Sequence, residues 1–380
     1  MTDQTDTTPL SSSLLAWYDK NGRDLPWRVR GAHPNPYLVW VSEIMLQQTT
    51  VQTVIPYFYR FMDKFPTIES LANADIEDVL LMWQGLGYYT RARKLYECAK
   101  TIVADYGGKF PETYAELLKL PGIGPYTAAS ISSLAFDKPE AVVDGNVIRV
   151  IARLYSMTEP VDQIKQEIVK KAQQLMPKER AADYTSAIMD LGATVCTPKN
   201  PKCKSCPFNS DCCALKEGTV DEIPIIVKLE KVKKSGPLFW IENERGEVFI
   251  RKRTETGLLS GLTEFPWSAD DVSVGKKEPE FPFAGGWTFT NKSVKHVFTH
   301  IQLSLDIYKT EVSGKEEKSS DFKDFKTKTG GIFVSKENFK DYPFSTLMKK
   351  VIAEMEKPDV KKNKKSGSNK KTENKQLSDF

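Results

Sequence analysis

The stretch Leu120-Pro-Gly-Ile-Gly-Pro-Tyr-Thr-Ala128 decides the fold of the first half of the chain. Pro121 is expected to end one helix, and Gly122 and Gly124 permit a tight turn with uncovered backbone N–H groups. A second helix should begin near Pro125, because proline suits the first turn of a helix. The free N–H groups at the two glycines can bind a phosphate. An ordinary corner between two helices uses the same residue types, so the stretch favours nucleic-acid binding without requiring it.

The sequence around this turn is helical in pattern from Leu14 to about Val220, with breaks at Gly and Pro and without strong strand alternation. We therefore expect an all-α unit over residues 1–220. Its predicted helices include Tyr37–Gln48, Val51–Phe61, Ile76–Trp83, Arg91–Asp105, Tyr114–Lys119, Thr127–Phe136, Val147–Tyr155 and Gln163–Leu175.

The composition changes at residues 221–235, which are extended and charged and are predicted to be a linker. Residues 236–356 should form an α+β domain, and the lysine-rich residues 357–380 a disordered tail, because such a segment cannot bury a core. The chain is thus expected to be multidomain. The predicted elements of the second domain are strands Pro237–Ile241, Glu247–Arg251, Phe298–Tyr308 and Gly331–Val334 and a helix Phe344–Met355.

Composition narrows the possible partners. The 380 residues carry a formal net charge of +4, which is only mildly basic. No apolar run approaches the ~20 residues that span a bilayer, so no membrane partner is expected.

Two carboxylates stand out as a pair for acid–base chemistry. Asp144 follows Gly124 by twenty residues and precedes a predicted helix, where it can act as the N-cap. A carboxylate at a helix start is favoured as an anion and can face a developing cation. Glu43 stands among apolar residues such as Trp40 and Ile44, and poor hydration there would raise its pKa and suit it to donate a proton.

Four cysteines follow this segment at gaps of six, two and five residues. They are Cys196, Cys203, Cys206 and Cys212. Thiolates at short gaps can converge on one inorganic centre, either an iron–sulfur cluster or a structural zinc. Two disulfides are the remaining alternative, and the absence of a secretory signal argues against them.

Together these segments resemble a known family. The turn at residues 120–128 with Asp144 is similar to the helix-hairpin-helix signature of base-excision DNA glycosylases. The stretch Tyr37-Leu-Val-Trp-Val-Ser-Glu-Ile-Met-Leu-Gln-Gln-Thr49 resembles that of the MutY family, which removes adenine mispaired with 8-oxoguanine. The cysteine gaps resemble the [4Fe–4S] loop of endonuclease III and MutY glycosylases.

The resemblance implies roles for individual residues. Glu43 would protonate adenine and Asp144 would stabilise the sugar cation, while Tyr126 and Asn146 would orient them and the water. Endonuclease III-like enzymes have a nucleophilic lysine where Tyr126 stands, so the chain is expected to be monofunctional and to leave the DNA backbone intact. Gln48 and Tyr88 are expected to insert into the DNA helix. The residues expected to contact the substrate are Leu25, Trp27, Arg28, Leu46, Gln48, Thr49, Val51, Leu86, Tyr88 and Ser186. The family commonly has Glu or Gln at the position of Ser186.

The second domain resembles the Nudix-like domain of the same family over residues 257–266, although the Nudix catalytic helix with its paired glutamates is absent. Phe298-Thr299-His300 falls where the family has a Phe-Ser-His loop that reads 8-oxoguanine. We therefore expect lesion recognition there and no hydrolase activity. By the same resemblance we expect a monomer that acts in the bacterial cytoplasm, associated with the nucleoid, and mismatch-repair or clamp proteins are possible partners.

Two other functions stay open at this point. One is a bifunctional glycosylase and lyase, which Tyr126 and the second domain argue against. The other is a damage-sensing binder without catalysis, which the presence of both Glu43 and Asp144 argues against.

Overall fold

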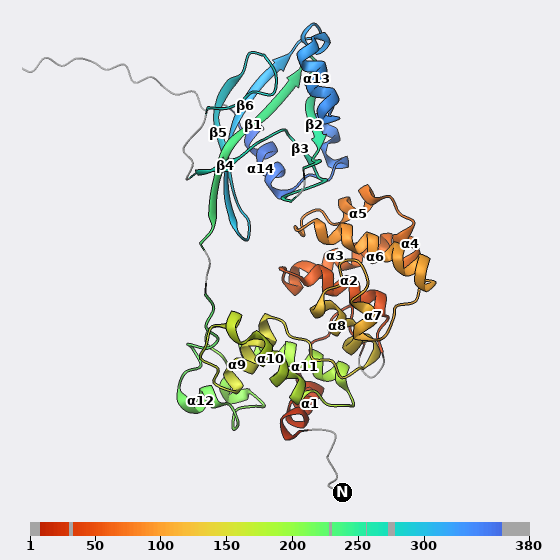
Figure 1. Ribbon diagram of the computed structural model, residues 1–380, viewed down its shortest axis with the longest axis vertical. Coiled ribbons are helices and arrows are strands. Elements are labelled where there is room, and N and C mark those ends of the chain that lie inside the picture. Colours follow the sequence, from red (N-terminus) through yellow and green to blue (C-terminus); the bar gives the residue numbers. More distant parts are fainter. Residues whose placement is uncertain (1–7, 30–32, 228–229, 256, 273–277, 359–380) are drawn as a thin grey trace, which may run out of the picture.

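The computed structural model describes residues 8–29, 33–227, 230–255, 257–272 and 278–358. Its first part is helical, as the sequence predicted, and its second part is built on a sheet (Figure 1). The helices of the first part are α1 (Pro9–Asn21), α2 (Pro36–Leu46), α3 (Val51–Lys64), α4 (Ile68–Ala72), α5 (Ile76–Met82), α6 (Thr90–Tyr106), α7 (Tyr114–Leu117), α8 (Pro125–Phe136), α9 (Gly145–Leu154), α10 (Val161–Leu175), α11 (Ala181–Thr194) and α12 (Cys213–Glu217).

These helices form two lobes, each with its own apolar core. The first lobe contains α2 to α8 and buries aromatic residues such as Trp40, Phe61 and Trp83. The second lobe contains α9 to α12 together with α1, which returns to pack against α11 (Figure 1). Burial of this apolar surface is the main force that holds each lobe together. The chain crosses between the lobes after α1 and again after α8, so residues distant in sequence meet at their junction.

The turn between α7 and α8 has the conformation that the glycines predicted. Gly122 has a φ of +74°, and a Cβ there would meet the Cβ of Lys94 at 2.5 Å. Leu120 and Ile123 are buried and anchor the turn. Helix α8 begins at Pro125 without a side-chain cap, which leaves backbone N–H groups of its first turn available to an outside acceptor.

The C-terminal domain has one mixed sheet with the strand order β3-β2-β1-β6-β5, to which β4 adds beside β1 and β7 beside β2. β1 and β6 are parallel, and the other pairs are antiparallel. Helix α14 (Thr346–Met355) covers one face and α13 (Ser320–Thr329) covers the other, because alternate residues of β1 point to opposite sides. The strands are β1 (Val232–Asn243), β2 (Val248–Lys252), β3 (Thr263–Glu264), β4 (Asp270–Asp271), β5 (Thr288–Val297), β6 (Ile301–Val312) and β7 (Ile332–Val334).

One predicted strand was wrong in its extent. Residues 298–300 form the turn of a hairpin, and β6 begins only at Ile301. The partner strand β5 was not predicted, because this edge strand is largely exposed and rich in polar residues, which obscures the alternation of a half-buried strand. β1 begins at Val232, within the stretch interpreted as a linker. The predicted tail lies outside the described residues except for Lys357 and Pro358.

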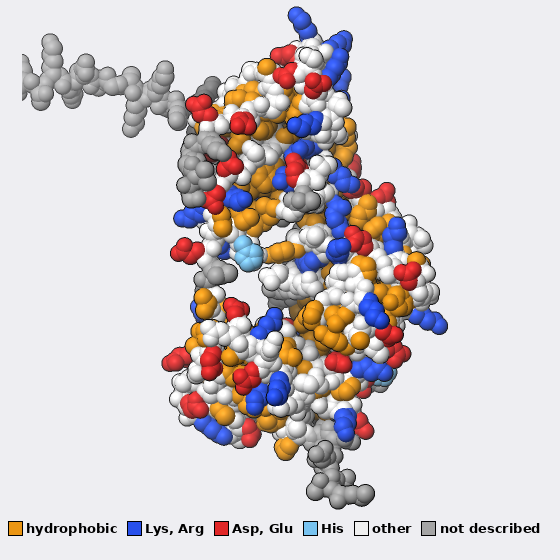
Figure 2. Space-filling model, viewed as in Figure 1, with side chains coloured by type: hydrophobic (Ala, Val, Ile, Leu, Met, Phe, Trp, Pro, Cys, Tyr) orange, Lys and Arg blue, Asp and Glu red, His pale blue; other side chains and the backbone are white. Residues whose placement is uncertain are grey.

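The C-terminal domain rests on the first lobe through a few directed contacts. Arg93 Nη2 donates to the Gly261 carbonyl at 2.7 Å, and Leu262 is buried in the core of the first lobe. Gln84 Nε2 donates to the Phe344 carbonyl at 3.1 Å. Figure 2 shows an open space between the two lobes and the C-terminal domain. Among the described residues, no helix combines the length and apolarity needed to cross a membrane.

Candidate active site

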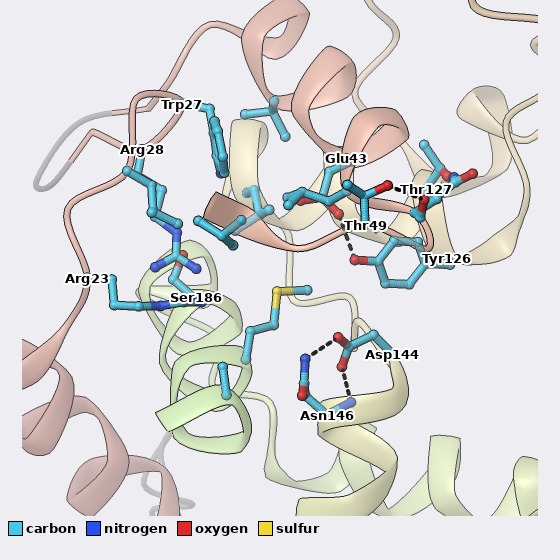
Figure 3. A pocket seen from close by; sticks show the side chains of 18 of the residues that line it. Arg23, Trp27, Arg28, Glu43, Thr49, Tyr126, Thr127, Asp144, Asn146 and Ser186 are labelled. Carbon is cyan, nitrogen blue, oxygen red and sulfur yellow. Dashed lines mark hydrogen bonds between the residues drawn. The ribbon is translucent and has the colours of Figure 1, made fainter. Parts of the chain in front are cut away.

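A cavity of about 1070 Å³ lies at the junction of the two lobes. It brings together most of the residues that the sequence suggested, from α2, the α2–α3 loop, α8, the start of α9 and α11 (Figure 3). The predicted residues that line it are Leu25, Trp27, Arg28, Glu43, Leu46, Gln48, Thr49, Val51, Gly122, Gly124, Tyr126, Asp144, Asn146 and Ser186.

Glu43 enters this cavity from the last turn of α2. Its side chain is only 4% exposed, and it follows the buried Trp40 along the helix. The Tyr126 hydroxyl donates a hydrogen bond of 2.7 Å to Glu43 Oε2 (Figure 3). Burial raises the pKa of Glu43, and the bond from Tyr126 opposes part of that rise. A raised pKa suits Glu43 to hold a proton and donate it to a substrate better than an exposed carboxyl group would.

Asp144 is the N-cap of α9, as predicted. Its Oδ1 accepts the backbone N–H of Asn146 at 2.9 Å and of Val147 at 2.8 Å. Its Oδ2 accepts the Asn146 side-chain amide at 2.8 Å. Three donors and the positive end of the helix dipole stabilise the carboxylate as an anion. In Figure 3 the ring of Tyr126 lies between Glu43 and Asp144, and both carboxyl groups line the same cavity.

Arg149, which the sequence did not single out, supports Asn146 from behind. Arg149 Nη2 donates to Asn146 Oδ1 at 2.9 Å and to the Gly192 carbonyl at 2.6 Å, and its Nε donates to the Cys196 carbonyl at 2.7 Å. Gly192 permits this approach, because a Cβ there would meet the Asn146 Cβ at 2.7 Å. A chain of hydrogen bonds thus joins the cap of α9 to the first cysteine of the loop.

Asp190 is a second residue that the sequence analysis missed. It is fully buried in α11 and accepts two bonds from Arg23, through backbone N and Nε, both at 2.8 Å. Arg28 Nη1 donates to Asp190 Oδ2 at 2.9 Å. These guanidinium groups lower the pKa of Asp190 despite its burial. The ion pairs hold the segment that carries Leu25, Trp27 and Arg28 against the cavity wall.

Some predicted residues lie outside the cavity. Tyr88 is 48% exposed on the loop before α6, and its hydroxyl is hydrogen-bonded to that of Thr299. Phe298, Thr299 and His300 form the turn between β5 and β6. Leu86 is 5% exposed and packs in the core of the first lobe, so its side chain is not presented to the cavity.

The four predicted cysteine ligands line one small cavity of about 30 Å³ together with Arg153 and Leu215. All six cysteines have free thiols, so the disulfide alternative was wrong. Arg153 Nη1 lies 3.4 Å from Cys196 Sγ and donates to the Thr197 carbonyl at 2.8 Å, which fixes this loop to α9. Within the described part of the chain, no three His, Cys, Asp or Glu side chains are close enough to hold a single metal ion.

Comparison with known proteins agrees with this architecture. Residues 41–178 match the model of the HhH-GPD superfamily of base excision DNA repair proteins, and residues 238–354 match that of the NUDIX domain. An adenine DNA glycosylase of Rattus norvegicus is 35% identical over an alignment that covers 92% of this chain and 78% of the relative. One from Buchnera aphidicola subsp. Schizaphis graminum is 36% identical, over 78% of this chain and 85% of the relative.

A solved structure of a thermostable thymine-DNA glycosylase aligns with a TM-score of 0.49 and 30% identity, over 55% of this chain and 95% of that one. The fold is that of a helix-hairpin-helix base excision DNA repair protein carrying a second, Nudix-type domain. Within that class, the chain belongs to the adenine DNA glycosylase family.

Proposed function

We propose that this protein hydrolyses the N-glycosidic bond of adenine mispaired with 8-oxoguanine or guanine in duplex DNA, and that it leaves the backbone intact. The observation that carries the proposal is the placement of the buried Glu43 and of Asp144, the N-cap of α9, on either side of Tyr126 in one cavity. A buried carboxyl group opposite a carboxylate that is hydrogen-bonded at a helix start suits glycoside cleavage through an oxocarbenium-like transition state. The adenine DNA glycosylase relatives indicate the base that is removed.

The chemistry begins with adenine flipped out of the duplex into the cavity. Glu43 donates its proton to adenine N7, the C1′–N9 bond breaks, and its electron pair leaves with the base. The positive charge on the sugar faces the Asp144 carboxylate, which stabilises it electrostatically or through a transient covalent bond. Water then attacks C1′ and gives a proton to the Glu43 carboxylate, which restores the acid.

The cavity wall would hold the flipped base. Leu25, Trp27, Leu46 and Val51 supply apolar contacts, and Ser186 and Arg28 supply the polar ones. The small Ser186 side chain reaches less far toward an adenine edge than the Glu or Gln of the family. Arg28, oriented by Asp190, is therefore the stronger candidate for a polar contact with the base.

Tyr126 supports a monofunctional reaction. Strand cleavage by a lyase requires an amine that forms a Schiff base with the sugar, and a phenol cannot form one. Burial raises the pKa of Tyr126 well above its ordinary value, so the hydroxyl stays protonated and continues to donate to Glu43. Ile148, one turn after Asp144, offers no amine either.

Recognition of the duplex around the mispair is assigned to Gln48, Gly122 and Gly124, which line the cavity, and to residues that lie outside it. Gln48 and Tyr88 would insert into the helix near the lesion, and the backbone at Gly122 and Gly124 would bind a phosphate. Phe298, Thr299 and His300 would read 8-oxoguanine, with the Thr299 hydroxyl as hydrogen-bonding group. The contact between Tyr88 and Thr299 supports this assignment, because it brings the inserting residue and the reading loop together.

The cysteine loop is proposed to hold a [4Fe–4S] cluster. Cys196, Cys203, Cys206 and Cys212 line one small cavity, which supports a shared inorganic centre, and the gaps between them resemble those of the [4Fe–4S] loop in the family. The cluster would close the loop that carries Lys199, Lys202 and Lys204 and so shape a surface for DNA phosphates.

The test is single-turnover release of adenine from a duplex with adenine opposite 8-oxoguanine, resolved with and without hot alkali. Strand breaks only after alkali are the expected result. Breaks without alkali would favour the bifunctional alternative. Tight binding to the mispair without any adenine release would favour a damage-sensing binder.

A further inference from the structure

Arg91, in the first turn of α6, joins two loops that are distant in sequence. Its Nη1 donates to the carbonyls of Ile44 and Met45, the latter at 3.4 Å. Its Nη2 donates to the carbonyls of Leu86 at 3.2 Å and Gly87 at 3.1 Å. One guanidinium therefore binds both the end of α2 and the loop that leads into α6.

The first pair of acceptors belongs to the last turn of α2, whose final carbonyls have no partner within the helix. A cation at this position also complements the negative end of the helix dipole. Helix α2 carries Glu43 in the same turn and leads directly into the loop with Gln48. Arg91 thus fixes the point from which that loop leaves the helix.

The second pair of acceptors immediately precedes Tyr88. Tyr88 and Gln48 share an unusual backbone, because both are left-handed, with φ of +48° and +60°. Residues other than glycine adopt this conformation only where the surroundings enforce it. The carbonyls of Leu86 and Gly87 lie two residues and one residue before Tyr88, and those of Ile44 and Met45 lie four and three residues before Gln48. Arg91 therefore binds the backbone close to both left-handed residues.

The guanidinium itself is largely enclosed. It lies over the rings of Trp83 at 5.4 Å and Tyr88 at 5.6 Å, and its Nε is buried. Burial lowers the pKa of Arg91 to about 10, which still leaves it charged at neutral pH. Both terminal nitrogens are committed to carbonyls, so the group is placed to order the loops and not to reach a DNA phosphate.

We propose that Arg91 is a positioning residue that holds Gln48 and Tyr88 together as one preformed wedge. This inference rests on the proposed function, in which both residues enter the duplex beside the lesion. Preorganisation matters here because a loop that must be ordered on binding spends part of its interaction energy on that ordering.

The experiment measures wedge insertion separately from catalysis. A duplex carries 2-aminopurine beside 8-oxoguanine, and its fluorescence rises when the protein unstacks it. The variants are Arg91→Met, Arg91→Lys, the double variant Gln48→Ala/Tyr88→Ala, and that double variant combined with Arg91→Met. Lys100→Met is the matched control, because it removes an exposed charge on the same helix. Thermal unfolding and near-ultraviolet circular dichroism establish that each variant is folded.

We expect Arg91→Met to reduce unstacking about tenfold, which is equal to about 1.4 kcal/mol. In the Gln48→Ala/Tyr88→Ala background, the same substitution should reduce unstacking further by less than about twofold, because the effects of coupled residues are not additive. Arg91→Lys should behave like Arg91→Met, because a lysine lacks the planar fork. If Arg91→Met does not fold, Arg91→Lys carries the same test. The log–log salt slope of DNA binding should not change, whereas loss of a phosphate contact would reduce it by about 0.9.

Equal factors in both backgrounds, or a reduced salt slope, would overturn the inference while leaving the proposed function intact. If Gln48→Ala/Tyr88→Ala itself leaves unstacking unchanged, the assignment of the wedge within the proposed function is wrong, and the role of Arg91 falls with it.

Discussion

The Tyr126 hydroxyl and the Glu43 carboxyl are joined by a hydrogen bond of 2.7 Å, between side chains from α8 and α2. Because the bond is donated to the carboxylate, it lowers the pKa of Glu43, which burial raises. The geometry thus tunes the group that is proposed to protonate adenine.

Tyr126→Phe should change both the rate of adenine release and its dependence on pH. Removing the donor raises the pKa of Glu43 further, so the descending limb of the rate, where Glu43 loses its proton, should move to higher pH. The rate at its optimum should fall about tenfold, as for loss of one orienting hydrogen bond. Single-turnover rates across pH would measure both effects. A descending limb that stays at its wild-type position would contradict the proposed proton donor.

Asp144→Asn should abolish adenine release while mispair affinity stays within about tenfold. The asparagine oxygen can still accept the N–H groups of Asn146 and Val147, so α9 keeps its cap and the protein should fold. What disappears is the negative charge that faces the sugar cation. Rates come from single-turnover assays and affinities from titration of an uncleavable duplex. Release near the wild-type rate would refute the assigned role.

Phe298→Ala should slow adenine removal opposite 8-oxoguanine about tenfold and opposite guanine only about twofold, as for loss of an aromatic contact. Phe298 is half-buried against the ring of His296 at 4.6 Å, which fixes its direction. The adjacent Val297→Ala is the control, because Val297 is 56% exposed on the same strand end. An equal effect on both duplexes would show that this turn does not read the lesion.

The sequence predicted those parts of the molecule that depend on local chemistry. The glycines and prolines of residues 120–128 predicted the turn before α8, and Asp144 was expected to cap α9. Turns and helix caps could be predicted because they depend on residues close together in the sequence. Glu43 and Tyr126 could be proposed as partners only through a resemblance, since 83 residues separate them.

Polar pairs between residues distant in the sequence could not be predicted from the sequence. Arg149 and Asp190 look like ordinary helical charges in sequence, and only the packing of α11 against α1 and α9 shows that both are buried. Arg91 likewise looks like an ordinary helix-surface charge in the sequence, but in the structure it donates to backbone carbonyls. Charged residues are a weak signal in sequence because most of them are solvated.

Asp190→Asn should destabilise the protein and remove part of its sensitivity to acid. The pKa of Asp190 is lowered in the folded state, so its stabilising contribution is present above the unfolded pKa and is lost as pH falls through the folded pKa. We expect the variant to lose about 3 kcal/mol of unfolding free energy near pH 7. This value is at the lower end of the range for a broken buried ion pair, because the Arg23 side chain is 29% exposed.

The measurement is urea unfolding of the wild type and the variant at several pH values from 7 down to the acid limit of folding. Asp183→Asn on the same helix is the control, since its ion pair with Arg180 is partly exposed and should contribute less than about 1 kcal/mol. The stability difference between wild type and Asp190→Asn should shrink as the solution becomes more acidic, because both proteins then carry a neutral group at this position. A difference that stays constant with pH would show that Asp190 stabilises the Arg23–Arg28 segment through its shape and hydrogen bonds, without a contribution from its charge.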